Sequence, residues 1–376
     1  MRAVVVHDSE DLGRSTRRMV LGSGLECRGN DFIPFEALEE RLAGGDANVI
    51  VVRIGSDPVQ AVELAARAVS LCQSPVFAVG PLGDESLKQQ LRMAGATHMR
   101  DDAVMQTEFD TAVESMADTQ SETRLRGRVI SVISPTSGSG ATTLAANLAG
   151  ALAGWHPQGV VFAEIGRTVA DVPLRLDFAA EIGTNEICRR WEQLDSTSLV
   201  AGLQQRGSGL RVLAHTGDDQ AHYDAHYDDD PLQPMAVHRV GVLMRSNFPF
   251  SVWKLDSTID EECLEALRLS DDILIVIRPD VLCVRRAQVA CQLLETQGVE
   301  TEQIRLIANR WGQPGQLTRR QIESALERPI FQTIPDEAKI ANKALNRGSL
   351  FSEVSRAAPL TKSIVKLAKR LERENS

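Results

Sequence analysis

Short apolar runs alternate with amphipathic stretches over the first 116 residues of the chain. The apolar runs predict strands, of which the clearest are Ala3 to His7, Val49 to Val52, Pro75 to Val79 and Thr97 to Met99. The stretches between them carry apolar residues three and four positions apart, which predicts helices at Leu12 to Leu21, Phe35 to Leu42, Val59 to Leu71 and Glu85 to Met93. Strands that alternate with helices form parallel sheets covered on both faces. The pattern therefore predicts a doubly wound α/β domain, with a flavodoxin-like receiver fold, at residues 1–116.

A polar segment without apolar periodicity, residues 117–127, follows this domain and predicts an exposed linker. A second α/β series then occupies residues 128–376. Its predicted strands are Val129 to Ser134, Gly159 to Glu164, Leu210 to His215, Phe250 to Leu255, Asp272 to Ile277, Ile304 to Asn309 and Ile330 to Ile334. We therefore expect an α/β protein with two doubly wound parallel-sheet domains.

Composition and charge narrow the possible functions. With 43% hydrophobic and 24% charged residues in 376 positions, the chain has the make-up of a folded protein of two or three domains. The net charge of −10 argues against a broad nucleic-acid-binding surface, because phosphate neutralisation requires clustered Lys and Arg. No apolar run approaches the length of a membrane-spanning helix, and the N-terminus turns acidic at Asp8. We expect a cytoplasmic protein with no nucleic-acid partner and at most an indirect membrane association.

The first strand of the second series leads into a loop of small residues, PTSGSGATT, and then into an apolar helical run. Gly138 and Gly140 allow successive backbone N–H groups to turn toward an anion, and the helix that follows Ala141 adds its positive end. Thr142 would supply a hydroxyl ligand to Mg²⁺. However, Ala141 stands where the P-loop pattern G-K-[ST] has its lysine. The loop thus has the shape of a phosphate cradle without its principal cation.

The second series resembles the deviant Walker A ATPases related to MinD and ParA, which have a SIMIBI-type P-loop NTPase fold. Their loop, K-G-G-x-G-K-T-T, aligns with Thr136 to Thr143, with both lysines replaced. Val160 to Phe178 is similar to a family segment in which Glu164 and Gly166 stand at two usual aspartate positions. Asp256 ends a buried strand at the Walker B position, RLIANRW supplies Asn309 and Arg310, and the segment from residue 334 to residue 351 is similar to a fifth family stretch.

This resemblance implies a nucleotide site that holds ATP and Mg²⁺. The residues implied in nucleotide binding are Ser137, Gly138, Ser139, Gly140, Ala141, Thr142, Thr143, Asn309, Arg310 and Pro335. Asn309 and Arg310 correspond to the position that contacts adenine, although Asn309 could simply end a strand. Thr142 and Asp256 are the implied metal ligands, and Asp256 and Glu164 are the implied catalytic residues. For Asp256 the alternative is an ordinary polar residue at a strand end.

A receiver-like domain followed by this ATPase domain resembles the TadZ/CpaE proteins of type IVb (Flp/Tad) pilus assembly. Proteins of that family are described as localisation factors for the secretion machinery. The resemblance implies a homodimer that contacts the pilus or secretion machinery, or polar-localisation proteins. It also implies recruitment to the cell pole or to the inner face of the membrane.

The missing lysines bear on catalysis more than on binding. Loss of a cation that stabilises the transition state of phosphoryl transfer costs about 10³ to 10⁵ in rate. Backbone donors, Thr142 and an adenine pocket would remain, so the sequence leaves nucleotide binding open. We expect a scaffold with weak or absent ATP hydrolysis. The alternative is an active Min/Par-type ATPase that cycles between monomer and dimer, with the lysine replaced from elsewhere, for example by Arg167 or Arg278.

The first domain lacks the residues that a phosphoaccepting receiver requires. The positions at the ends of its strands hold His7 and Asp8, then Arg53, Gly80 and Arg100, where a receiver has an acidic pair, an aspartate, a hydroxyl and a lysine. Arg53 cannot accept a phosphoryl group as an aspartate does. We therefore expect a pseudo-receiver that makes protein contacts. A phosphorylated response regulator is a third alternative.

Two further features have a functional and a structural interpretation. His222 and His226 could bind a metal from one helix face, but the six aspartates between residues 216 and 234 favour a solvated acidic loop. The last predicted helix, Leu360 to Arg373, carries basic residues beside an apolar stripe, as the membrane-targeting helix of MinD does. Since the helix lacks Trp and Phe, we expect its stripe to pack into the core.

Overall fold

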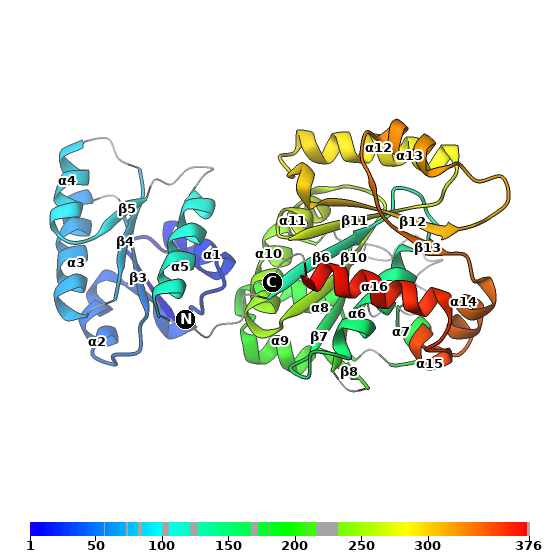
Figure 1. Cartoon of the computed structure of the whole chain (residues 1–376). Coiled ribbons are helices and arrows are strands. Elements are labelled where there is room, and N and C mark those ends of the chain that lie inside the picture. Colours follow the sequence, from blue (N-terminus) through cyan, green and yellow to red (C-terminus); the bar gives the residue numbers. More distant parts are fainter. Residues whose placement is uncertain are drawn as a thin grey trace, which may run out of the picture. The chain divides into compact units, whose positions relative to one another are not determined.

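The computed structural model describes residues 1–55, 57–72, 74–81, 85–99, 105–120, 127–166, 172–179, 181–207, 209–215 and 232–373 (Figure 1). The chain divides into two compact units, Met1–Arg124 and Leu125–Ser376. Most of the predicted acidic loop, including both of its histidines, lies outside the described residues, and so do Arg100 and Arg167.

The first unit is a doubly wound α/β domain. In its described residues the parallel sheet has the order β2-β1-β3-β4-β5, which is the flavodoxin-like order. The strands are β1 (Ala3–His7), β2 (Phe32–Pro34), β3 (Val49–Arg53), β4 (Val76–Val79) and β5 (Thr97–Met99). The helices are α1 (Glu10–Gly22), α2 (Leu38–Leu42), α3 (Pro58–Leu71), α4 (Glu85–Met93) and α5 (Met105–Gln120). Every residue of β1 and β3 is buried, as expected for inner strands covered on both faces.

The structure adds two elements to those predicted for this unit. Strand β2 is only three residues long, and helix α5 includes residues 117–120 of the predicted linker. The predicted helix at Phe35 to Leu42 is divided, since a 3₁₀ turn at Phe35–Ala37 precedes α2.

The second unit is built on a larger sheet with the order β13-β12-β11-β6-β10-β7-β9-β8 in the described residues. Its strands are β6 (Arg128–Ile133), β7 (Val160–Ile165), β8 (Gln204–Arg206), β9 (Leu210–Leu213), β10 (Phe250–Leu255), β11 (Asp272–Ile277), β12 (Ile304–Trp311) and β13 (Ile330–Pro335). All the strand pairs are parallel except that of β8 with β9 at the edge.

Helices cover this sheet on both faces. They are α6 (Ala141–Ala153), α7 (Val172–Leu176), α8 (Thr184–Arg189), α9 (Ser196–Gly202), α10 (Pro234–Asn247), α11 (Glu261–Arg268), α12 (Val281–Thr296), α13 (Arg319–Leu326), α14 (Ala338–Leu345), α15 (Phe351–Val354) and α16 (Pro359–Arg373). Since β10 lies between β6 and β7, the chain skips one strand after the β6 crossover. The loops that follow β6, β10 and β7 therefore end at one edge, where ligands bind in open α/β sheets.

The C-terminal helix α16 packs into the core of the second unit, as predicted. Its stripe of Leu360, Ile364, Leu367, Ala368 and Leu371 is buried in one cluster with α6 and the central strands. Figure 1 shows α16 in red alongside α6. Two basic side chains of the helix lie over aromatic rings, Arg370 over Phe331 and Lys369 over Trp155. Among the described helices, none combines the length and the apolar character needed to cross a bilayer.

Candidate functional site

The loop between β6 and α6 wraps around the start of a helix, as the sequence predicts. Gly138 and Gly140 adopt φ angles of 76° and 96°, a region that disfavours side chains. Gly140 is the N-cap of α6, and its position provides no side chain to cap the helix. The first N–H groups of α6 have no acceptor within the helix, so they and the helix dipole favour an anion at this end.

Hydroxyl groups inside the loop hold it in shape. Ser134 Oγ lies 2.8 Å from the carbonyl oxygens of both Thr136 and Val276, which ties the loop to β11. Ser139 Oγ donates to the Thr136 carbonyl at 2.8 Å. Thr136 stands where the family pattern has its first lysine, and only 6% of it is exposed. At the position of the family's first lysine, the loop therefore has a buried threonine whose carbonyl is held by hydrogen bonds within the loop.

Asn309 and Arg310 contact the loop from the end of β12. Asn309 Nδ2 donates to the Ser139 carbonyl at 2.7 Å, and Arg310 Nη2 donates to the Gly138 carbonyl at 3.2 Å. The pairing of β12 with β13 is irregular at these two residues, and Arg310 has a φ of 53°. A bulge of this kind redirects side chains at the end of a strand. In this structure the two predicted adenine contacts therefore act as a clamp on the loop backbone.

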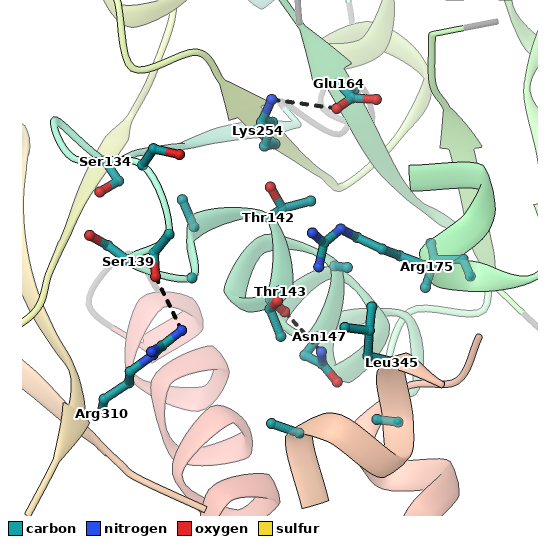
Figure 2. Close-up of a pocket in the computed structure, with 18 of the residues that line it drawn as sticks. Ser134, Ser139, Thr142, Thr143, Asn147, Glu164, Arg175, Lys254, Arg310 and Leu345 are labelled. Atoms are coloured by element: carbon teal, nitrogen blue, oxygen red, sulfur yellow. Dashed lines mark hydrogen bonds and ion pairs between the residues drawn. The ribbon is translucent and has the colours of Figure 1, made fainter. Parts of the chain in front are cut away.

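The loop forms one wall of a cavity of about 490 Å³ (Figure 2). The opposite side is formed by the ends of β7 and β10 and by helices α7 and α14. Five charged residues line this cavity among those described: Glu164, Arg175, Lys254, Asp256 and Arg310. The cavity is therefore large enough for a small-molecule ligand, and the cations outnumber the carboxylates by one.

Lys254 links the two predicted catalytic carboxylates. Its Nζ lies 3.4 Å from Glu164 Oε1 and 3.1 Å from Asp256 Oδ1. Burial raises the pKa of Glu164 to about 7, although the neighbouring Lys254 ammonium opposes this rise. A buried carboxyl whose pKa is shifted in this way is typical of functional sites.

Gly166 gives Asp256 the space that it occupies. A Cβ atom added to Gly166 would lie 2.5 Å from Asp256 Oδ2, and Gly166 has a φ of 136°. The family pattern has an aspartate at this position. Its replacement by glycine removes one carboxylate and lets Asp256 pack against the backbone.

The structure brings most of the predicted site residues together and shows others that the sequence reasoning missed. Ser137 to Thr143, Glu164, Asp256 and Arg310 line the cavity, whereas Asn309 reaches only the loop and Pro335 pairs with Trp311 at the end of β13. The residues that were missed are Asn147, Arg175, Lys254 and Asn342. Lys254 was detectable, because residues two apart on a strand point to the same side and Asp256 had been identified.

Cations reach the cavity from segments other than the loop. The loop itself has no lysine, but Lys254 and Arg175 come from other segments. Arg278, named above as a possible replacement, lies with its Nε 3.2 Å from Asp280 Oδ2 and is not among the residues that line the cavity.

The magnesium site implied by Thr142 and Asp256 can be tested against these contacts. Both residues line the cavity. However, Asp256 Oδ1 already pairs with the Lys254 ammonium at 3.1 Å. The residues present do not fit a magnesium ion bound directly to Asp256.

Comparison with solved structures places this geometry among known folds, whereas no family model and no curated protein matches the chain. A ParA family ATPase from Chlorobium tepidum has a TM-score of 0.58 and 23% identity, over 65% of this chain and 98% of that chain. MinD from Pyrococcus horikoshii, solved with Mg-ADP, has a TM-score of 0.56 and 17% identity, over 66% of this chain and 98% of that chain. The second unit has the MinD/ParA ATPase fold.

A MinC:MinD complex from Aquifex aeolicus is also similar, with a TM-score of 0.53 and 21% identity, over 65% of this chain and 96% of that chain. The matched share of this chain corresponds to the size of the second unit alone. The MinD/ParA fold therefore explains the sheet and the loop of that unit.

The first unit has its receiver-like positions at the carboxyl ends of its strands. Arg53 ends β3 and is 2% exposed, and His7 ends β1 with its ring 4.2 Å from that of Phe32. Asp8 lies against the backbone at Gly55, where an added Cβ would be 2.0 Å from Asp8 Oδ1. The position of a phosphoaccepting aspartate is thus filled by a buried arginine.

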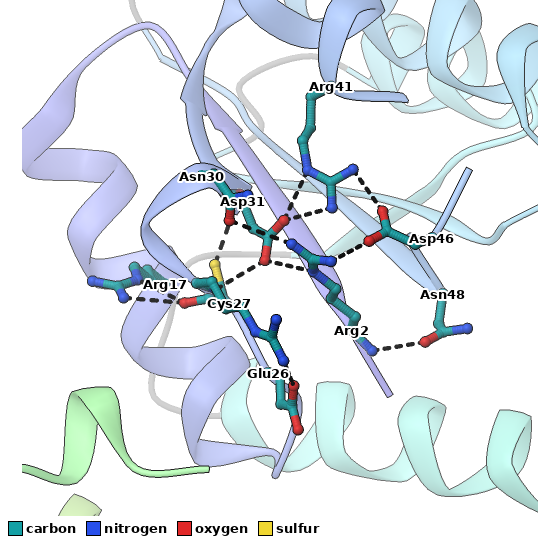
Figure 3. Close-up of polar contacts among 10 residues, drawn as sticks. Arg2, Arg17, Glu26, Cys27, Asn30, Asp31, Arg41, Asp46 and Asn48 are labelled. Atoms are coloured by element: carbon teal, nitrogen blue, oxygen red, sulfur yellow. Dashed lines mark hydrogen bonds and ion pairs between the residues drawn. The ribbon is translucent and has the colours of Figure 1, made fainter. Parts of the chain in front are cut away.

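An ion-pair network lies at the opposite, amino-terminal ends of these strands (Figure 3). Asp31 accepts hydrogen bonds from Arg2 Nε at 2.8 Å, from Arg41 Nε and Nη2 at 2.8 and 2.6 Å, and from the Arg28 backbone at 2.9 Å. Burial would raise the pKa of Asp31, but the bonds from Arg2 and Arg41 outweigh it and hold the pKa below its ordinary value. Asp46 pairs with the same two arginines. The network therefore joins the segments that precede β1, β2 and β3.

Replacing Asn309 with alanine tests the clamp on the loop. The change removes the hydrogen bond to the Ser139 carbonyl, whose net contribution is about 1 kcal/mol. We expect amide hydrogen exchange in residues 136–143 to become several-fold faster, as measured by mass spectrometry. Asn247→Ala serves as the control, because the Asn247 amide bonds to Leu243 and Ser196 instead. Equal exchange in the Asn309 variant and the parent protein would mean that the loop holds its shape without the clamp.

Proposed function

We propose that this protein is a Flp/Tad (type IVb) pilus assembly and localisation factor. In this proposal it binds nucleotide through a degenerate MinD/ParA-like site, acts as a dimeric scaffold, and hydrolyses ATP weakly or not at all. One observation carries the proposal: the phosphate cradle keeps its backbone shape while Thr136 and Ala141 occupy both lysine positions.

Nucleotide binding is supported by the donors that remain. The N-terminus of α6 faces a cavity that also contains Arg175, Lys254 and Arg310. Backbone N–H groups at a helix start bind phosphate groups without a lysine, although less tightly. Two similar structures contain nucleotides, Mg-ADP in the Pyrococcus horikoshii MinD and ATP in a Cyanothece McdA variant (TM-score 0.51, 16% identity).

Weak hydrolysis is supported by the state of Lys254. Phosphoryl transfer depends on cations that stabilise charge in the transition state, and loss of one costs about 10³ to 10⁵ in rate. The Lys254 ammonium is paired with Glu164 and Asp256, so part of its charge is offset by these carboxylates and less of it is available to the transition state. We therefore place this protein among scaffolds.

A second candidate function is an active Min/Par-type ATPase that cycles between monomer and dimer. The presence of Lys254 and Arg175 in the cavity favours it, because either side chain could stabilise the developing charge. This alternative requires hydrolysis to depend on the cavity carboxylates.

Partners follow from the two-unit organisation in this proposal. The first unit is a pseudo-receiver that contacts the pilus or secretion machinery, or a polar-localisation protein, and recruits the second unit to the cell pole or the inner membrane face. The Aquifex aeolicus complex is an example of this fold bound to a different protein, MinC.

Deletion of the gene should remove pili, and a fluorescent fusion of the protein should form a focus in the cell. Normal piliation after deletion would contradict the pilus role.

ATP turnover decides between the two candidates. We expect the purified protein to bind ATP while turning it over about a thousandfold more slowly than a family member with the loop lysine. Asp256→Ala should then leave this residual rate unchanged. Turnover that disappears in Asp256→Ala would support the cycling ATPase, and size-exclusion mass with and without ATP would show whether dimerisation follows the nucleotide.

A further inference from the structure

The register of the central strands places Lys254 in a buried position. It lies directly opposite Glu164 on the neighbouring strand β7 and opposite Val132 on β6, the strand that leads into the loop. Its side chain is 10% exposed, and that of Glu164 is 2% exposed. Burying an ammonium is unfavourable unless it is paired. The two carboxylates therefore hold the ammonium at the cavity wall near Thr142 (Figure 2).

Of these two carboxylates, Asp256 is also the one implied as a ligand of a divalent cation, together with the Thr142 hydroxyl. Mg²⁺ requires oxygen ligands at about 2.0 to 2.1 Å in a regular octahedron, and in nucleotide sites these are one or two carboxylates, waters and phosphate oxygens. The Lys254 ammonium lies 3.1 Å from Asp256 Oδ1, so it would strongly repel a divalent cation bound to the same carboxylate. A metal could bind there only after the lysine had moved away.

The charge of the cavity already suits a polyanion. Lys254, Arg175 and Arg310 carry three positive charges, against two carboxylates at most, before any metal is added. Because the loop has no lysine, this surplus of positive charge is what the side chains contribute to the attraction of a phosphate group. The backbone N–H groups of α6 add to it.

We infer that Lys254 takes the place of the divalent cation, so that this site binds the phosphates of a nucleoside di- or triphosphate without Mg²⁺. This inference rests on the proposed nucleotide binding. The ammonium pairs with Glu164 and Asp256 and faces the phosphates when nucleotide binds. The alternative is a lysine that only neutralises the two carboxylates and makes no contribution to binding.

Titration of the full-length protein with ATP and ADP, in excess Mg²⁺ and in excess EDTA, tests the inference. We expect the two conditions to give dissociation constants within about threefold of each other. Lys254→Met should weaken binding in EDTA by about tenfold or more, which corresponds to the loss of one charged hydrogen bond. Lys254→Arg should keep binding in EDTA. Lys362→Met, at an exposed lysine of α16, should match the parent protein in both conditions.

The outcomes separate the inference from the proposed function. Binding that requires Mg²⁺ overturns the inference and leaves the proposed function standing, whereas absence of binding in both conditions overturns the proposed function. Lys254→Met that binds as well as the parent protein in EDTA also overturns the inference. Lys254→Met leaves two buried carboxylates unpaired and could for that reason fail to fold. In that case the double variant Lys254→Met/Glu164→Gln, which keeps only one of these carboxylates, is measured instead. Circular dichroism verifies the fold of each variant.

Discussion

Replacing Asp31 with asparagine is expected to lower the free energy of unfolding of the first unit by about 3 to 5 kcal/mol. The Asp31 carboxylate is fully buried, and the side chains of Arg2 and Arg41 are largely buried around it. The variant leaves both guanidinium groups without their main counter-charge. Since the pKa of Asp31 is held below its ordinary value, the carboxylate stabilises the unit above about pH 4 and loses this effect as the pH falls further.

The location of the tryptophans allows the unfolding of the two units to be followed separately. All four, Trp155, Trp191, Trp253 and Trp311, belong to the second unit. Denaturation followed by circular dichroism should therefore show an early transition in Asp31→Asn, while the transition in tryptophan fluorescence stays in place. Asp46→Asn is the matched control, because Asp46 pairs with the same arginines but is half exposed, and its effect should be much smaller. Equal effects of the two substitutions would rule out burial as the source of the stabilisation.

Replacing Glu164 with glutamine is expected to remove a pH dependence from the stability of the second unit. The folded protein raises the pKa of Glu164 from 4.5 to about 7, so it holds a proton that the unfolded chain releases. Its contribution to stability is therefore fully present below pH 4.5 and is lost as the pH rises through about 7, by up to about 3 kcal/mol. The glutamine variant cannot ionise, so it should gain this amount relative to the parent protein between pH 5 and pH 8.

Urea denaturation followed by tryptophan fluorescence at several pH values measures this gain. Glu353→Gln is the control, since its carboxylate is partly exposed and paired with Arg206 at 3.0 Å. Burial acts to raise the pKa of Glu353, but the bonds from Arg206 leave it lowered, so the shift is opposite in direction to that of Glu164. A constant difference between Glu164→Gln and the parent protein from pH 5 to pH 8 would show that Glu164 has an ordinary pKa in the fold.

The inner strands of both sheets were predictable because they are mostly apolar, with nearly continuous apolar runs in β1, β3 and β11, and such runs arise where helices cover both faces. The edge strands β5 and β13 were also predicted, whereas the edge strands β2 and β8 were not. β2 has a single buried residue, Ile33, and β8 reads Gln-Gln-Arg with none. These two strands are held by backbone pairing with a neighbour and bury few side chains, so they leave little trace in the side-chain pattern.

The residues of the candidate site were likewise predictable only in part. The loop and Asp256 follow from local patterns, a glycine-rich turn before a helix and a carboxylate after a buried strand. The roles of Asn309 and Arg310 depend on a bulge that redirects their side chains, and a one-dimensional pattern contains no sign of it. Lys254 was missed for another reason, because a lysine in an apolar run is usually assigned to an exposed edge.

The position of Lys254 bears on how such sites are recognised and how they change over time. A motif search that requires a lysine after the second loop glycine would classify this chain as a relic. The positive charge, however, can reach the same phosphates from a neighbouring strand. A family of such proteins could therefore exchange one cation for the other during evolution and still bind the same ligand. An incomplete loop motif in a related sequence is then weak evidence that nucleotide binding has been lost.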